Sequence, residues 1–165
     1  MKHFFTVIFL ILWQASVSQT LTTYVDTQKR FSIGRPVASK IKEYTDSIGL
    51  TLIVFLSGLD EEDKVTYYSV SVGGVSKSNL NEIYHQIRAR YLMLGQTIKL
   101  EVECVSNNTF FKKFLVVDSS IHKTETLNYL ALKGKFIYVL SFTTPNSLNA
   151  DYSLYNSIFE TFKIN

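Results

Sequence analysis

The chain has 165 residues but only one cysteine, two prolines and one tryptophan. A single cysteine excludes an internal disulfide, so the fold must be stabilised by its hydrophobic core, even in an oxidising compartment. The formal net charge is only +3, and such a balance does not indicate binding to nucleic acid or to an anionic membrane. Beyond the first residues no apolar run reaches the length of about 20 residues that a membrane-spanning helix needs, so we expect no integral membrane segment in the mature chain.

Patterns that hold metals or cofactors are also scarce. Gly73–Gly74 is an isolated pair and does not make a phosphate-binding loop. His85 and His122 stand alone in the sequence, whereas a metal site needs several ligands at suitable spacing. Asp60–Asp63 lacks the alternating oxygen ligands and the glycine of a calcium loop, so we interpret it as a solvated turn. We therefore expect no cofactor and no metal ligand.

Cys104 is the candidate for a catalytic nucleophile, with His85 or His122 as its base. However, it falls on the apolar side of an alternating strand, together with the apolar residues of Ile98–Val102. Buried free cysteines are common in protein cores. We interpret Cys104 as a core residue without a chemical role, so no catalytic residue is assigned and a non-enzyme is favoured.

The first 18 residues have the composition of a secretory signal peptide. After a short basic start, Phe4–Trp13 is an almost unbroken apolar run, about half as long as a membrane anchor requires. Small residues then precede a cleavage point after Ser18, so that the mature chain begins at Gln19. We predict an exported protein, periplasmic or extracellular, in which residues 19–165 form one domain.

The clearest structural pattern lies between Asn79 and Cys104. Asn79 suits the N-cap of a helix, and Gly95 suits the left-handed position after its end. From Ile98 to Cys104 apolar and charged residues alternate, which predicts a strand with one wet face near the edge of a sheet. The apolar stripe of the helix consists of Leu80, Ile83, Tyr84, Ile87, Tyr91 and Leu94.

The remaining elements are mostly strands. Thr20–Asp26 is predicted to begin loosely, and Val37–Tyr44 is ambiguous between helix and strand. Leu148–Phe162 has the spacing of a final helix. Several strands are apolar in both registers, so we expect the two helices to cover opposite faces of one antiparallel sheet. The strands are predicted at Arg30–Pro36, Thr51–Leu56, Val65–Val72, Phe111–Val117, Thr124–Leu132 and Lys135–Thr143, with turns at Ser57–Lys64 and Ser106–Thr109.

Further patterns lie near the two ends of the mature chain. Phe31–Pro36 reads F-S-I-x-x-P, a tyrosine-containing strand occupies Phe136–Phe142, and Ile158–Asn165 reads I-F-E-T-F-K-I-N. Together they resemble the PsbP and Mog-type family, with a departure at Val37, where many relatives carry a tryptophan shortly after the proline. The resemblance implies an α+β fold in which an antiparallel sheet is sandwiched between helices, an α/β/α arrangement. It also implies an adaptor or assembly module, usually without catalysis.

Two classes of function are compatible with these observations. The one we favour is an exported, non-enzymatic binding or assembly module, monomeric and with an unknown protein partner. The alternative is a small hydrolase or small-ligand carrier with a helix-on-curved-sheet fold of the NTF2 or cystatin type. A deep apolar pocket with converging polar groups would support the alternative. A filled interior with an exposed aromatic patch would support the binding module.

Phe110 is the candidate for a partner contact. It adjoins an Asn-Asn turn and shares the register of Lys112, on the side of the strand opposite Phe111. The more common placement of such a ring would be in the core with Phe114, under a helix. Asn107 begins an N-x-T sequon on the same turn, which is a glycosylation site only if the source is eukaryotic.

Overall fold

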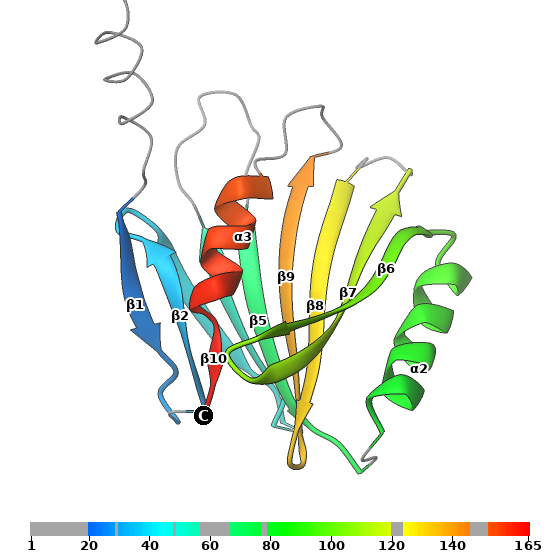
Figure 1. Cartoon of the computed structure of the whole chain (residues 1–165), viewed down its shortest axis with the longest axis horizontal. Coiled ribbons are helices and arrows are strands. Elements are labelled where there is room, and N and C mark those ends of the chain that lie inside the picture. The colour runs from blue at the N-terminus through cyan, green and yellow to red at the C-terminus, as the bar shows by residue number, and fades with distance from the viewer. Residues whose placement is uncertain are drawn as a thin grey trace, which may run out of the picture.

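The structure, a computed structural model, describes residues 20–28, 30–47, 49–56, 67–76, 79–119, 124–145 and 152–165. The predicted signal peptide with its cleavage point at Ser18 and Gln19, the acidic turn Asp60–Asp63 and His122 lie outside the described residues. Figure 1 shows the arrangement of the elements. In chain order they are β1 (Leu21–Val25), β2 (Phe31–Pro36), β3 (Lys40–Thr45), β4 (Thr51–Leu56), β5 (Tyr67–Gly74), α2 (Leu80–Met93), β6 (Thr97–Ser106), β7 (Thr109–Asp118), β8 (Thr124–Lys133), β9 (Phe136–Pro145), α3 (Tyr152–Thr161) and β10 (Lys163–Ile164).

The large sheet has seven strands in the order β3-β4-β5-β9-β8-β7-β6, and every neighbouring pair is antiparallel. The predicted meander of β6 to β9 is confirmed. The alternating strand β6 lies at one edge, as its wet face predicted, and β4 lies inside, with buried residues alternating with half-buried ones. The ambiguous segment Val37–Tyr44 contributes β3, a strand rather than a helix, at the other edge.

A small sheet of β1, β2 and β10 was not predicted. Thr20–Asp26 was expected to begin loosely, but β1 pairs with β2 along its whole length, from Leu21 opposite Pro36 to Val25 opposite Ser32. After α3 the chain returns as β10 and pairs with the other side of β2. The described residues near both termini therefore meet at one strand, β2.

A buried ion pair closes the turn between β1 and β2. The Asp26 carboxylate is buried and accepts hydrogen bonds from Arg30 Nε and Nη2, each at 2.9 Å. Burial alone would raise the pKa of Asp26, but the hydrogen bonds and the charge of Arg30 outweigh it, and the pKa lies below its usual value. Both partners are thus charged at neutral pH.

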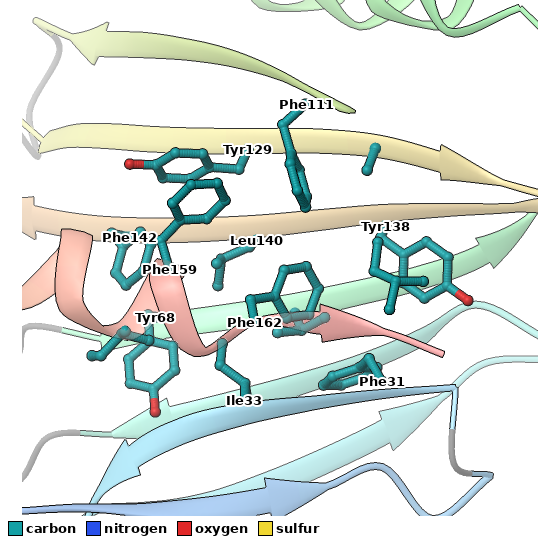
Figure 2. Packing of buried hydrophobic residues seen from close by; sticks show 14 of the residues in the cluster. Phe31, Ile33, Tyr68, Phe111, Tyr129, Tyr138, Leu140, Phe142, Phe159 and Phe162 are labelled. Atoms are coloured by element: carbon teal, nitrogen blue, oxygen red, sulfur yellow. The ribbon is translucent and has the colours of Figure 1, made fainter. Parts of the chain in front are cut away.

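The main core lies between the large sheet on one side and α3 with the small sheet on the other. Its centre is aromatic, and Figure 2 shows the side chains of Tyr129, Phe142 and Phe159 lying together there. The ring centroids are 3.9 Å apart for Tyr129 and Phe159, and 4.7 Å apart for Phe142 and Tyr155. Fully burying each such side chain contributes about 1.5–3 kcal/mol. Gly34 lets α3 approach β2, because a Cβ there would lie 2.8 Å from Thr161 Oγ1.

A second core lies on the opposite face of the large sheet, under α2. Ile83 and Tyr84 of α2 pack with Phe114, Val116 and Leu130. Successive residues of a strand point to opposite faces, so neighbouring residues of β8 belong to different cores. The antiparallel α+β fold class is confirmed. The helical layer of α2, however, lies at the β6–β8 end of its face, while the other face is covered by α3 together with a sheet (Figure 1).

The ends of α2 follow the predicted signals. Asn79 is the N-cap, and its side-chain oxygen accepts a hydrogen bond from the Asn81 N–H at 2.9 Å. Gly95 follows the C-cap with φ 74°, a conformation that glycine adopts without a Cβ penalty. Leu94 was assigned to the apolar stripe, which is wrong: it occupies the C-cap position beyond the last helical residue, and its side chain is exposed.

A β-bulge in β6 changes which side chains share a face. Its pairing with β7 shifts between Ile98 and Leu100, so the extra residue reverses the alternation. Ile98 therefore packs in the second core, whereas Leu100 and Cys104 pack against the main core. The predicted common face of Ile98 and Cys104 is wrong for this reason. Cys104 is also half-buried rather than fully buried, and Val102 is exposed.

Candidate contact surface

The β6–β7 hairpin presents the predicted contact residue. Ser106 pairs with Thr109, which leaves Asn107 and Asn108 as a two-residue turn. Both have positive φ, 48° and 59°, as the favoured two-residue hairpin turns require, and asparagine tolerates this conformation better than most residues. The Asn-Asn sequence therefore explains why the chain reverses here.

Asn107 also fixes the tip of the hairpin to α3. Its Nδ2 donates hydrogen bonds to the carbonyl oxygens of Glu160 and Phe162, at 2.9 and 3.0 Å. The last carbonyl groups of a helix have no hydrogen-bond donor within the helix. The Asn107 side chain provides that donor at the end of α3. In Figure 1 the hairpin accordingly reaches across toward β10. A glycan on Asn107 would be attached to this same nitrogen, and glycosylation remains a prediction for a eukaryotic source only.

The two faces of the hairpin differ in what they contact. Phe111 is fully buried, and its ring centroid lies 5.1 Å from that of Phe159 in the main core. Phe110 points to the opposite side, where it is 45% exposed and pairs across the strands with Val105, which is 69% exposed. The placement of Phe110 in the core with Phe114 is therefore wrong, and the two outward apolar side chains lie next to each other on the surface.

An ion pair adjoins these apolar side chains. Glu103 and Lys112 are the next pair on the same face of the hairpin, and their carboxylate and ammonium form a salt bridge. The Lys112 ammonium lies 5.7 Å from the centroid of the Tyr84 ring, at a distance where the ring attracts a cation. We call the set Glu103, Val105, Phe110 and Lys112 the hairpin surface.

Tyr84 supports the hairpin surface as a neutral ring. Burial, and secondarily the charge of Glu101, raises the pKa of Tyr84 to about 12. The phenol therefore stays protonated at physiological pH. On the same side of the sheet, Arg88 of α2 donates to the Glu101 carboxylate at 3.2 Å, which ties α2 to β6 beside the hairpin surface.

A second group of exposed apolar side chains ends α2. Leu92, Met93 and Leu94 are 45%, 82% and 66% exposed. Leu92 and Met93 lie off the apolar stripe that faces the sheet, and no role was predicted for them from the sequence. The available signal was that they are large apolar residues at positions where a solvated helix face carries polar ones.

Of the candidate catalytic residues, the structure describes Cys104 and His85, and it does not bring these two together. Cys104 faces the main core, and its burial raises the pKa of the thiol, an effect that the charge of Lys113 opposes. His85 is exposed on α2, on the other side of the sheet. Within the ranges that the structure describes, no three His, Cys, Asp or Glu side chains are placed to hold a metal ion.

Lys112 and Lys113 also diverge, as alternation requires. Lys112 lies over Tyr84, whereas the Lys113 ammonium lies 5.2 Å from the centroid of the Tyr129 ring on the main-core side. They do not form one basic patch. Neither described helix combines the length and the apolar character needed to cross a membrane.

Comparison with known proteins gives a result for structure but not for sequence. No protein-family model and no curated protein sequence matches the chain. Cyanobacterial PsbP (CyanoP) from Synechocystis sp. PCC 6803 is similar in structure, with a TM-score of 0.63 and 9% identity over 92% of this chain and 96% of that one. The Ran-binding protein Mog1p of Saccharomyces cerevisiae has a TM-score of 0.59 and 14% identity, over 89% and 96% of the two chains.

A protein of Bacteroides thetaiotaomicron also matches, with a TM-score of 0.53 and 13% identity, over 89% of this chain and 49% of that one. At such identities the likeness concerns the fold. It confirms the resemblance to the PsbP and Mog-type fold that the F-S-I-x-x-P strand and the I-F-E-T-F-K-I-N ending indicated. The chain therefore has the PsbP/Mog1-like fold.

Proposed function

We propose that the protein is an exported, non-enzymatic module that binds another protein through the hairpin surface. Mog1p, which has the same fold, is described as a Ran-binding protein, so this fold supports protein binding in at least one other chain. The identity of the partner is a separate question, because this chain and Mog1p are only 14% identical.

The filled interior is the observation that carries this proposal. A carrier of the helix-on-curved-sheet type needs a cavity of about 300–1,000 Å³ for its ligand. Here the rings of α3 occupy the corresponding face of the large sheet: Tyr155 stacks on Phe142, and Phe159 stacks on Tyr129 at 3.9 Å. The main core is thus occupied by side chains, which favours binding at the surface.

The hairpin surface has the composition of a contact site. Buried aromatic rings contribute much of the free energy of protein interfaces, and charged groups at the rim set the orientation of the partner. Phe110 and Val105 supply the apolar part, and the Glu103–Lys112 pair supplies fixed charges beside it. Asn107 holds the hairpin tip against α3, so the surface is organised before a partner arrives, which lowers the entropic cost of binding.

Partner capture by Phe110→Ala tests the proposal, with Val102→Ala as the matched control. Both side chains are 45% exposed, but Val102 lies on the opposite face of the same hairpin. The mature protein is used to isolate its partner from the native host, and the affinities of the variants for that partner are then compared. We expect Phe110→Ala to weaken binding at least about 30-fold, as for an interface residue worth about 2 kcal/mol, and Val102→Ala to leave binding unchanged.

Melting temperatures distinguish a contact role from a structural one. Phe110→Ala should melt within a degree or two of the wild type, because the ring is already partly in water. A drop of several degrees would mean that Phe110 stabilises the fold. Unchanged affinity with unchanged melting would show that the hairpin surface does not bind the partner.

The proposal that the protein is exported rests on the signal-like residues that precede Gln19. We propose cleavage after Ser18, followed by release of the mature chain as a monomer into the periplasm or the exterior. The intact mass of the protein from its host tests this, since the mature chain should begin at Gln19. A species that retains Phe4–Trp13 would contradict export as a released protein.

A further inference from the structure

The two edges of the large sheet are not equivalent. At one edge, β6 carries a bulge between Ile98 and Leu100 and a tip fixed by Asn107, and bulges are a common protection against further strand pairing. At the other edge, β3 has β4 as its only strand partner among the residues that the structure describes, in a regular register from Lys40 opposite Leu56 to Thr45 opposite Thr51. All six residues of β3 are exposed. The β3 edge is thus a regular, solvent-facing strand.

The ladder with β4 determines which β3 groups point outward. The Asp46 N–H donates to the Leu50 carbonyl oxygen at 3.0 Å, and this pair directly follows Thr45 opposite Thr51. Hydrogen-bonded and non-hydrogen-bonded pairs alternate along an antiparallel ladder. Lys40, Lys42 and Tyr44 therefore bond to β4, while the N–H and C=O groups of the alternate residues, Ile41, Glu43 and Thr45, face away from the sheet.

The side chains of β3 give its two faces different charge. Lys40, Lys42 and Tyr44 share one face, and within the described ranges neither lysine lies in a salt bridge. Glu43 lies on the other face, where it accepts hydrogen bonds from the hydroxyls of Tyr24 and Thr27, at 3.5 and 3.3 Å. The one acidic side chain of β3 is thus held toward the β1–β2 turn, and the charged side chains that β3 itself places on its other face are Lys40 and Lys42.

We propose that β3 binds an extended segment of a partner protein as an added strand, with acidic residues at alternate positions facing Lys40 and Lys42. The outward N–H and C=O groups of Ile41, Glu43 and Thr45 would supply the main-chain hydrogen bonds. The two lysines, about 7 Å apart along the strand, select carboxylates with the same spacing. This site is separate from the hairpin surface, and a module with both can join two partners.

Pairing of β3 with a second copy of itself is disfavoured by charge. If two copies of β3 pair antiparallel about a two-fold axis at Lys42, the two Lys42 residues lie opposite each other. If the axis lies at Glu43, the two Glu43 residues lie opposite each other. Like charges directly opposite each other destabilise a sheet. A pairing centred on Tyr44 aligns only the second half of the strand. An acidic segment of another protein has none of these conflicts.

Amide hydrogen exchange in the mature protein tests the proposal with a defined probe. The probe is a capped peptide of alternating valine and glutamate, and the control is the same peptide with lysine in place of glutamate. When the glutamate peptide occupies about 90% of the protein, exchange at the Ile41, Glu43 and Thr45 amides should slow about tenfold. The amide of Lys42, already bonded to β4, should change little, and the lysine peptide should have no effect.

Substitutions separate main-chain from charge recognition. Glu43→Pro removes both the carboxylate and an outward N–H, and it should abolish binding of the glutamate peptide. Glu43→Val removes the same carboxylate but keeps the N–H. The change in affinity caused by Glu43→Val therefore measures the contribution of the side chain alone. If Glu43→Pro lowers stability, the double variant Lys40→Glu/Lys42→Glu provides the test, because it should bind the lysine peptide instead. Phe110→Ala should leave all these results unchanged, which separates this site from the hairpin surface.

Three outcomes would overturn the proposal. One is the absence of protection at millimolar glutamate peptide. The second is equal protection by both peptides, which would leave the lysines only as a guard against aggregation. The third is protection that rises with protein concentration without peptide, which would show that the β3 edge pairs with another copy of the chain.

Discussion

Asp26 and Arg30 show how a single side chain determines a local structure. The carboxylate is fully buried and is held by a guanidinium that is itself mostly buried. Removing one partner of such a pair leaves an uncompensated charge and costs about 3–5 kcal/mol. We therefore predict that Asp26→Asn lowers the free energy of unfolding by about that amount at pH 7.

The pH dependence of this difference follows from the lowered pKa of Asp26. A depressed pKa in the folded state contributes stability above the ordinary value of 3.8, and this contribution is lost as the pH falls through the folded-state pKa. Urea unfolding of both proteins should show a constant difference from pH 7 to about pH 5 and a shrinking one at more acidic pH. A difference that already shrinks between pH 7 and pH 5 would contradict a depressed pKa.

Asn107 links the hairpin to α3, and its neighbour provides a control. Asn107→Asp keeps a residue that tolerates positive φ but removes the N–H donor to the carbonyls of Glu160 and Phe162. With two hydrogen bonds lost, we expect a destabilisation of about 1–3 kcal/mol. Asn108→Asp, on the same turn with φ 59°, should be nearly neutral. Equal effects of the two changes on the melting temperature would mean that the turn, not the contact with α3, accounts for the loss.

For single residues, the sequence predicted the face of the strand to which a side chain points better than it predicted whether that side chain is exposed. Strand alternation placed Phe110 and Phe111 on opposite faces, and the structure confirms this. Whether Phe110 is covered depends on where α2 ends relative to the hairpin, a tertiary relation that no local pattern contains. The contacts of Asn107 with α3 were unpredictable for the same reason, because they join residues more than 50 positions apart.

Among α2 and the strands of the large sheet, α2 was the most predictable and β3 the least. Asn79 and Gly95 are local signals, since each acts on backbone groups within its own helix turn. β3 is an edge strand with six exposed residues, so it carries no apolar alternation that would distinguish a strand from a helix. The bulge in β6 arises from its pairing with β7 and is likewise invisible in β6 alone.

Helix α3 fills the main core, and its buried residues test that role. We predict that Ile158→Ala and Phe159→Ala each lower the free energy of unfolding by about 2–5 kcal/mol, because both side chains are buried against the large sheet. Ser157→Ala, at an exposed position next to them in the sequence, should change it by less than about 0.5 kcal/mol. Near-neutral results at both buried positions in urea unfolding would mean that α3 does not pack on the sheet.

For the whole molecule, the order of elements sufficed to predict an antiparallel α+β fold, because short connections make sequential strands neighbours. The small sheet was not predictable in this way. Its strand β10 has only two residues and pairs with β2 from the far end of the chain, so no local pattern marks it as a strand. The proposed function depends on a consequence of this packing, the filled main core.

The central claim is that the protein binds partners at its surface and holds no small molecule inside. Native mass spectrometry of the protein isolated from its host tests this most directly. We predict a chain that begins at Gln19, alone or with a second protein, and the same chain mass after denaturation. A small molecule retained at one copy per chain, released only on unfolding, would contradict the claim, because it would require a cavity where the rings of Tyr129, Phe142, Tyr155 and Phe159 stack.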